Sequence, residues 1–309
     1  MLPVSQHNAS DLTVRSGYAY LLSDPSHVRV TRRASRNSLY LVHLFQINNS
    51  HACVVPQTMG FGLSAEPWAE NDLPSGRDEI LNGGLQMASD VLKNWKRGKL
   101  YKFKNPNGED FQVQTFHTYH GSEYWLSRQS KHTIDEALYE KMVYYLNGSE
   151  RTKTGEWAMP DRTRRSRLEK EYIEVLSDCE ILKVTDSGWA LVNLEYNLGK
   201  PLSIRDFNEW VYPIAPYVDE TGREVSLIVS LNAQVPMKQS SVEKNHTAAY
   251  YASVERLAYD RDTGELEWLM CTTSDAGGNV PKWMQNATIA KTVAKDVPYL
   301  FNFLNTKQT

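Results

Sequence analysis

The stretch from Glu265 to Leu304 constrains the fold of this chain more than any other. Its first part is rich in aromatic, apolar and β-branched side chains, which is the composition of a strand buried on at least one face. The adjacent glycines Gly277 and Gly278 follow, and they give the backbone access to positive φ angles. From Val280 onward, apolar residues recur every three or four positions. The stretch therefore predicts a strand, a tight turn and a long amphipathic helix that packs on a sheet.

One residue interrupts this helical pattern. Pro298 lies within it, and proline lacks the N–H group that an interior helix position needs. We therefore predict that the helix kinks near Ala294, or that it ends there and restarts.

The composition excludes several classes of protein. The chain has 309 residues, of which 41% are apolar, a net charge of −3 and a pI near 6.3. This charge balance predicts no nucleic-acid partner. No apolar run approaches the roughly 20 residues of a spanning helix, and no leader pattern is present at the N-terminus. The three cysteines are far apart and predict neither a disulfide framework nor a zinc site. We expect a cytoplasmic protein.

The rest of the chain alternates between helical and strand patterns. A helix is expected over residues 77–95, although Gly83 and Gly84 weaken that pattern. A second helix is expected over residues 134–146, with Thr133 as its N-cap. The expected strand pairs are residues 100–104 with 111–120, 180–184 with 188–198, and 248–259 with 265–273, and a further strand is expected in 225–235.

This pattern divides the chain into two parts. Residues 1–70 show no sustained periodicity and are predicted to form a partly ordered N-terminal extension. Residues 71–309 are predicted to form one domain of the α+β class.

Several segments resemble a known family. Residues 275–286 match the START signature, with its aspartate, two glycines, apolar-proline pair, tryptophan and asparagine, in spacing and in kind. Residues 200–207 resemble the START segment in which a proline-led turn enters an Arg-Asp-aromatic strand. Residues 251–256, 267–270 and 294–297 are similar to an uncharacterised START-like family found mostly in fungi. The resemblance covers roughly residues 71–304 and implies a helix-grip fold, a curved antiparallel sheet wrapped around a long C-terminal helix.

The resemblance also implies an internal cavity between the sheet and the last helix. Gly277 and Gly278 are the candidate hinge of a lid formed by that helix. Arg205 and Glu255 are candidate polar groups, and either could instead belong to a structural ion pair. The candidate cavity-lining residues are apolar or aromatic: Tyr196, Tyr251, Trp268, Met270, Trp283, Ala287, Val293 and Phe301.

The implied function is non-catalytic binding of a lipid or sterol for transfer or sensing. Two alternatives remain: a cyclase-like or hydrolase-like enzyme on the same scaffold, or an interaction scaffold whose cavity is filled by side chains. The candidate acid–base groups for an enzyme are His117, His120 and His132, together with paired acidic residues. No catalytic residue, metal ligand or cofactor is predicted, since no motif for any of them is present. Neither the ligand nor the oligomeric state is predicted.

A cluster of arginines precedes residue 168. Arg162, Arg164, Arg165 and Arg167 could contact lipid headgroups during a transient encounter with a membrane surface. The alternative is a solvated loop that leads into a helix.

Overall fold

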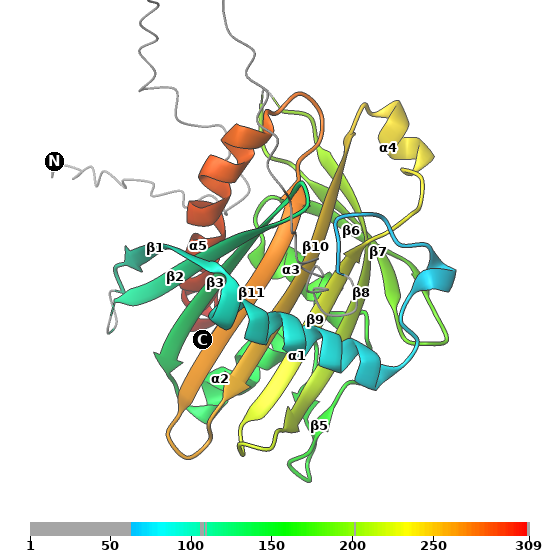
Figure 1. Cartoon of the computed structure of the whole chain (residues 1–309). Helices are drawn as coiled ribbons and strands as arrows, with labels where there is room; N and C mark the ends of the chain where they lie inside the picture. The colour runs from blue at the N-terminus through cyan, green and yellow to red at the C-terminus, as the bar shows by residue number, and fades with distance from the viewer. Residues whose placement is uncertain (1–62, 106–107, 109, 201, 308–309) are drawn as a thin grey trace, which may run out of the picture.

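The computed structural model describes residues 63–105, 108, 110–200 and 202–307 (Figure 1). These residues form one large sheet with helices on both faces. The sheet has nine strands in the order β1-β2-β3-β11-β10-β9-β8-β7-β6. Its strands are β1 (Lys96–Phe103), β2 (Phe111–His120), β3 (Glu123–Thr133), β6 (Leu176–Val184), β7 (Ala190–Tyr196), β8 (Arg205–Val218), β9 (Glu224–Asn232), β10 (Thr247–Tyr259) and β11 (Glu265–Asp275).

The sheet is antiparallel apart from one short contact. Residues 247–249 at the start of β10 pair in parallel with residues 205–207 of β8. The predicted final hairpin is present, with Tyr251 opposite Ser274 and Tyr259 opposite Leu266. Strands β7, β8 and β9 are buried on both faces along most of their length, because helices cover both sides of the sheet.

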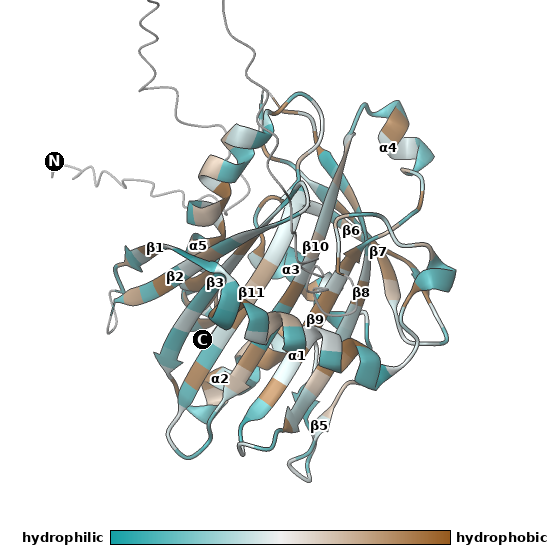
Figure 2. Cartoon of the chain, viewed as in Figure 1, coloured by the Kyte–Doolittle hydropathy of each residue, from teal (hydrophilic) through white to brown (hydrophobic). Residues whose placement is uncertain are grey.

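Helix α1 (Arg77–Asn94) crosses one face of the sheet and contacts β9, β10 and β11. Apolar residues alternate with polar ones along it (Figure 2). The glycines that weakened the sequence pattern are buried against the sheet. A Cβ atom at Gly84 would lie 2.7 Å from Leu227 Cδ2, so any other residue here would force the buried Leu227 side chain to shift.

The other face is covered by three helices: α2 (Glu136–Asn147), α3 (Arg164–Tyr172) and α5 (Lys282–Thr306). The curved sheet with a long C-terminal helix confirms the predicted α+β architecture. Helix α5 begins two residues later than predicted, with Pro281 as its N-cap. It also runs through Pro298 without ending, because its apolar face, including Val297 and Leu300, stays buried in the core on both sides of that residue.

One capping prediction is wrong. Thr133 is the last residue of β3, and Asp135 is the N-cap of α2. The Leu138 N–H donates to Asp135 Oδ1 over 2.8 Å, since a carboxylate at this position satisfies a helix N–H group.

The smaller elements connect the sheet and helices. They are the single turn Glu70–Asp72, the two-stranded β4 (Glu150–Arg151) and β5 (Trp157–Ala158), and α4 (Gln239–Glu243). Residues 1–62 of the predicted extension lie outside the described residues, and the boundary at residue 70 stays a prediction. Residues 63–69 pack on the domain: Leu63 is buried, and the Trp68 N–H donates to the Asn232 carbonyl over 2.8 Å.

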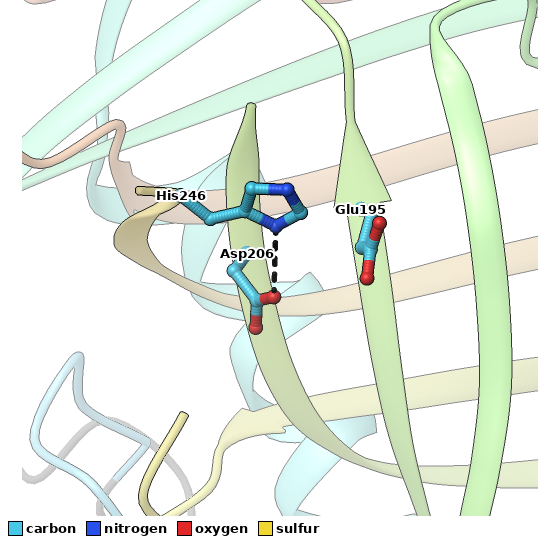
Figure 3. A group of neighbouring side chains, drawn as sticks. All are labelled: Glu195, Asp206 and His246. Carbon is cyan, nitrogen blue, oxygen red and sulfur yellow. Dashed lines mark ion pairs between the residues drawn. The ribbon is translucent and has the colours of Figure 1, made fainter. Parts of the chain in front are cut away.

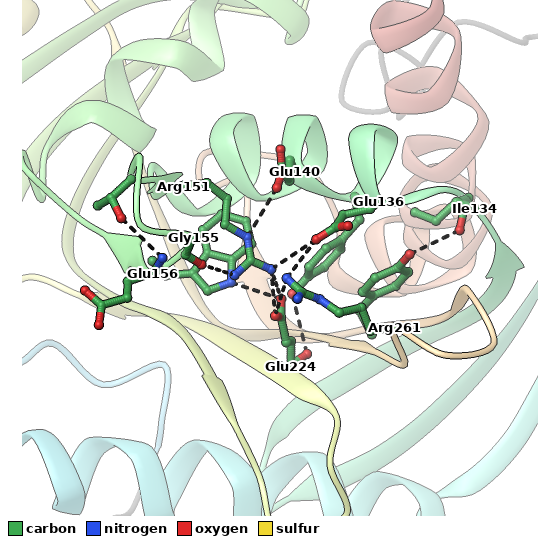
Figure 4. A network of polar contacts seen from close by, with 12 residues as sticks. Ile134, Glu136, Glu140, Arg151, Gly155, Glu156, Glu224 and Arg261 are labelled. Atoms are coloured by element: carbon green, nitrogen blue, oxygen red, sulfur yellow. Dashed lines mark hydrogen bonds and ion pairs between the residues drawn. The ribbon is translucent and has the colours of Figure 1, made fainter.

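A dense polar network joins α2, the β4–β5 pair, β9 and the β10–β11 turn (Figure 4). Glu224 is at its centre. Its two carboxylate oxygens accept hydrogen bonds from Arg151 Nη2 at 2.6 and 2.8 Å, and Oε2 also accepts one from Trp157 Nε1 at 2.9 Å. Arg261 lies 3.2 Å from the same carboxylate and 2.7 Å from that of Glu136. Because its carboxylate is fully paired, we interpret this network as structural.

None of the helices in the described part of the chain is long and apolar enough to span a membrane.

Candidate functional site

A cavity of about 110 Å³ lies between the sheet, α3 and α5. Its wall combines apolar and aromatic side chains with four carboxyl groups and two arginines. The lining residues are Arg128, Leu146, Arg165, Glu169, Tyr172, Ile173, Leu194, Tyr196, Phe207, Glu209, Ser230, Tyr251, Glu255, Trp268, Met270, Val293, Asp296, Tyr299 and Leu300.

Strand alternation places the sheet residues in this wall. Trp268 and Met270 are two apart on β11, as are Phe207 and Glu209 on β8, so each pair points to the same face of the sheet. Helix α5 closes the opposite side, with Val293 among its cavity residues.

A buried ion pair lies at the centre of the cavity wall. Arg128 Nη2 donates to Glu255 Oε1 over 3.1 Å, and the two side chains are 2% and 11% exposed. Trp268 Nε1 donates to the same oxygen over 2.7 Å, and the Arg128 guanidinium lies 4.0 Å from the Trp268 ring centroid. Low exposure strengthens each of these contacts, because water screens them little.

A second buried pair lies on α3. Arg165 Nη2 donates to Glu169 Oε1 over 2.7 Å, and Arg165 Nε donates to the Leu146 carbonyl over 2.9 Å. Within the described residues, three polar atoms of the two pairs have no hydrogen-bond partner: Arg128 Nε, Arg128 Nη1 and Glu169 Oε2. Buried polar atoms of this kind are usually satisfied by water or by a ligand. The cavity can therefore hold a polar group as well as apolar ones.

Two carboxyl groups in the wall are shifted toward their neutral forms. Burial, aided by the negative charge of Glu169, raises the pKa of Glu209 to about 8. Burial likewise raises the pKa of Asp296 to about 7, against the opposing effect of Arg128. Near neutral pH, both groups can therefore donate a proton or a hydrogen bond to a bound molecule.

The raised pKa of Glu209 makes stability depend on pH. Its carboxyl stays protonated in the folded protein after it has ionised in the unfolded chain, so stability falls as pH rises from about 5 to about 8. In Glu209→Gln, which cannot ionise, we expect this fall to be smaller by about 3 kcal/mol. Urea denaturation across this pH range measures it. Glu180→Gln, at a side chain that is 53% exposed, is the control and should keep the wild-type slope. Equal slopes in wild type and Glu209→Gln would contradict a raised pKa.

Five of the predicted cavity residues do line it: Tyr196, Tyr251, Trp268, Met270 and Val293. Phe301 is buried but faces away from the cavity. Its ring packs against Phe111 and His132, with centroid distances of 5.2 and 4.5 Å. Its neighbour Leu300 contacts the cavity instead.

Trp283 and Ala287 do not line the cavity, so these two predictions are corrected. Trp283 is 70% exposed and Ala287 is also exposed. At about 100° per residue, Trp283 and Ala287 lie roughly 80° and 120° around the helix from Val293. Gln285 is the buried residue of the first turn. The sequence stripe therefore combined two neighbouring faces of α5.

Arg205 lies beside the predicted hinge and not in the cavity wall. Its Nη1 donates to the Ser203 carbonyl over 2.8 Å, and its Nη2 lies 3.8 Å from where a side chain at Gly278 would begin. Both hinge glycines have positive φ, 64° at Gly277 and 65° at Gly278. The predicted polar group that does reach the cavity is Glu255, whose partner is Arg128.

The three candidate histidines do not line the cavity. His132 is packed against Phe111 and Phe301, and burial lowers its pKa to about 4. Its Nε2 lies 2.9 Å from Ser130 Oγ. A histidine held neutral in the core is unsuited to the acid–base role that the sequence left open.

Sequence reasoning missed most of the charged residues in the wall: Arg128, Arg165, Glu169, Glu209 and Asp296. Arg165 belongs to the predicted arginine cluster, yet it faces the interior from α3. The half-buried Arg164 and the exposed Arg167 are paired, since Arg164 lies 2.6 Å from Glu150 and Arg167 lies 2.5 Å from Asp161.

Comparison with known proteins completes the description. A family model described as a protein of unknown function, DUF3074, matches residues 125–304, more than half of the chain. No curated protein matches the sequence. The structure of human STARD10 is similar, with a TM-score of 0.50 and 10% identity over 75% of this chain and 80% of that one. Human StAR-related lipid transfer protein 5 gives a TM-score of 0.49 and 11% identity over 75% of this chain and 98% of its own. The chain therefore belongs to the DUF3074 family, and its domain has the START fold.

Proposed function

We propose that this chain binds a lipid or sterol in the cavity beneath α5, for transfer or sensing and without catalysis. The observation that supports the proposal best is the composition of the cavity wall. Apolar and aromatic side chains surround two buried ion pairs that still have unpartnered polar atoms. A pocket of this kind suits an amphipathic molecule, because the apolar part is removed from water and a single polar group is oriented.

The polar end of the ligand belongs beside Arg128. Its Nε and Nη1 have no partner among the described residues, and either could donate to a hydroxyl or carboxylate oxygen. The apolar part would contact Met270, Val293 and Leu194. Each methylene group that leaves water contributes about 0.8 kcal/mol, so the hydrocarbon would provide most of the affinity.

The structure corresponds to a closed state under this proposal. A volume of about 110 Å³ is well below the roughly 300 Å³ at the lower end for drug-sized ligands. Binding therefore requires α5 to move outward, with Gly277 and Gly278 as the hinge. A smaller void of about 30 Å³ shares Tyr251 and Val293 with the cavity and reaches Ala276 beside that hinge. We propose this route for ligand access.

A lipid carrier must also meet a membrane. Trp283, which does not line the cavity, is 70% exposed on the first turn of α5 and close to the hinge. Tryptophan is enriched where proteins contact the membrane–water interface. We propose that this end of α5 touches the membrane transiently while the lid opens. A cytoplasmic location fits the free thiols of Cys179 and Cys271.

A cavity-filling substitution tests the proposal. Val293→Trp adds an indole ring to the cavity wall, and we expect at least tenfold less co-purified lipid by native mass spectrometry and lipid extraction. The matched control is Val218→Trp, at a valine that is 66% exposed on β8, and it should keep the wild-type amount. Wild-type protein free of lipid, and unable to take any from vesicles, would contradict lipid binding and favour the interaction scaffold.

A second candidate function is supported by Glu209 and Asp296. Carboxyl groups whose pKa values are about 8 and about 7, inside a cavity, resemble the general acids and bases of enzymes. If the chain is an enzyme on the START scaffold, Glu209→Gln should abolish turnover while lipid binding is kept. Retained lipid binding alone, with no turnover in wild type, supports the carrier.

A further inference from the structure

Three potential metal ligands meet on the face of the sheet opposite the cavity (Figure 3). Glu195 on β7 and Asp206 on β8 are direct partners in the antiparallel ladder. His246 immediately precedes β10, whose first residues pair in parallel with β8 beside Asp206. The ligand atoms of the three side chains all lie within 4.8 Å of one another. Three elements that are distant in sequence are thus brought to one point.

The facing atoms of this cluster are buried and unsatisfied. Asp206 is 1% exposed, and its Oδ1 accepts a hydrogen bond from Asn193 Nδ2 over 2.6 Å. Asp206 Oδ2 and His246 Nδ1 have no hydrogen-bond partner within the described residues and lie 3.6 Å apart. An imidazole nitrogen that carries no hydrogen and a carboxylate oxygen repel each other unless a proton or another positive charge lies between them. That charge is either a proton on His246 or a bound cation.

The geometry suits a cation. A tetrahedral Zn²⁺ ion, with bonds of about 2.1 Å, places its ligand atoms roughly 3.4 Å apart. The 3.6 Å separation of Asp206 Oδ2 and His246 Nδ1 is close to this value, and the Glu195 carboxylate lies within 4.8 Å of both and would have to move closer to join them. A mixed set of imidazole and carboxylate ligands favours Zn²⁺ over Mg²⁺ or Ca²⁺. The Asn193 hydrogen bond fixes the Asp206 carboxylate, as outer-shell partners of metal ligands do.

A hollow borders the cluster at Asp206. It has a volume of about 450 Å³ and is lined by Asp206 and Asn208, together with residues 232–237. An ion could approach the Asp206 side of the cluster from this hollow. We propose that Glu195, Asp206 and His246 form a binding site for a divalent transition-metal ion, with Zn²⁺ the preferred one.

Lys238 would compete with the ion. Its ammonium group lies 3.1 Å from Glu195 Oε1 and 3.0 Å from Glu180 Oε2. The lysine supplies the positive charge near Glu195 while the metal is absent, and it can remain paired with Glu180 when the ion binds. Removing the charge of Lys238 should therefore strengthen the binding of the metal ion.

The experiment is calorimetric titration of the full chain with Zn²⁺. Seven other histidines are present, so the number of bound ions is compared between variants. We expect wild type to bind one more Zn²⁺ than His246→Gln and than Asp206→Asn, and to bind Mg²⁺ at least tenfold more weakly. His120→Gln removes a histidine outside the cluster and should match wild type. Co²⁺, substituted for Zn²⁺, should give the visible absorption of a tetrahedral site in wild type and lose it in His246→Gln.

Lys238→Met provides the second measurement, because a gain in affinity cannot result from unfolding. We expect it to bind Zn²⁺ at least threefold more tightly than wild type. Circular dichroism checks that each variant is folded. The same number of bound ions in wild type and folded His246→Gln would overturn the proposal and leave a protonated His246 paired with Asp206. Unchanged affinity in Lys238→Met, with no Co²⁺ absorption in wild type, would overturn it as well.

Discussion

Arg128→Met is expected to lower the free energy of unfolding by about 3–5 kcal/mol, measured by urea denaturation. Methionine has nearly the length of the arginine stem but no charge, so packing against Trp268 is largely kept. Glu255 would then be a buried carboxylate whose remaining polar contact is the indole N–H of Trp268. The loss arises from that unpaired charge, because the net contribution of a buried ion pair is small compared with the penalty for removing one partner.

A double substitution isolates this cause. Arg128→Met combined with Glu255→Gln removes both charges, and we expect it to recover most of the lost stability. Lys131→Met is the matched control on the same strand. Its side chain is 60% exposed and lies 3.5 Å from Glu265, so its loss should stay below about 1 kcal/mol. If the double variant were as unstable as Arg128→Met alone, the unpaired carboxylate would not be the cause.

Gly277→Ala is expected to disrupt the turn before α5. A Cβ atom at this position would lie 2.0 Å from the Ala248 carbonyl oxygen, and that oxygen belongs to the backbone of β10 and cannot turn aside. The residue also has a φ of 64°, which costs a side chain about 1–2 kcal/mol in any surroundings. Strain and clash together should exceed about 3 kcal/mol. Thermal and urea denaturation measure the loss.

Gly222→Ala separates the two effects. Gly222 has a φ of 83° in the turn between β8 and β9, and a Cβ atom there would have no neighbour within 4 Å. It therefore reports the backbone strain without the clash, and we expect a loss of about 1–2 kcal/mol. Similar losses of stability in the two variants would mean that β10 shifts at little cost to relieve the clash at position 277. The turn would then be too flexible to act as a defined hinge.

The fold could be predicted because its main signals are local. The strand before Gly277, the tight turn and the apolar period of the last helix each depend on residues close in sequence. The error at Trp283 and Ala287 came from the same periodicity. A stripe of apolar residues shows roughly which side of a helix is buried, but it does not separate the residues that face a cavity from those next to them on the helix surface. A large exposed tryptophan also gives the same apolar signal as a buried one.

The charged part of the cavity could be predicted only in part. On α3, Arg165, Leu168, Glu169 and Tyr172 have the spacing of one helix face, so the apolar members indicated where the arginine and glutamate would point. Glu209 offered no such signal. Its neighbours on β8 are buried on both faces, and alternation is then lost from the sequence. The cluster of Glu195, Asp206 and His246 depends on strand pairing between distant segments, which no local pattern reports.

The pairing of β7 with β8 has a consequence for insertions and deletions. Glu195 and Tyr196 are adjacent, as are Asp206 and Phe207, and in each case one side chain faces the proposed metal site and the other the cavity. Slipping one strand by a single residue would turn its carboxylate toward the cavity and its ring toward the proposed metal site. Inserting or deleting one residue within either strand would therefore disrupt the cavity and the proposed metal site together, although none of the residues that form them would have been substituted.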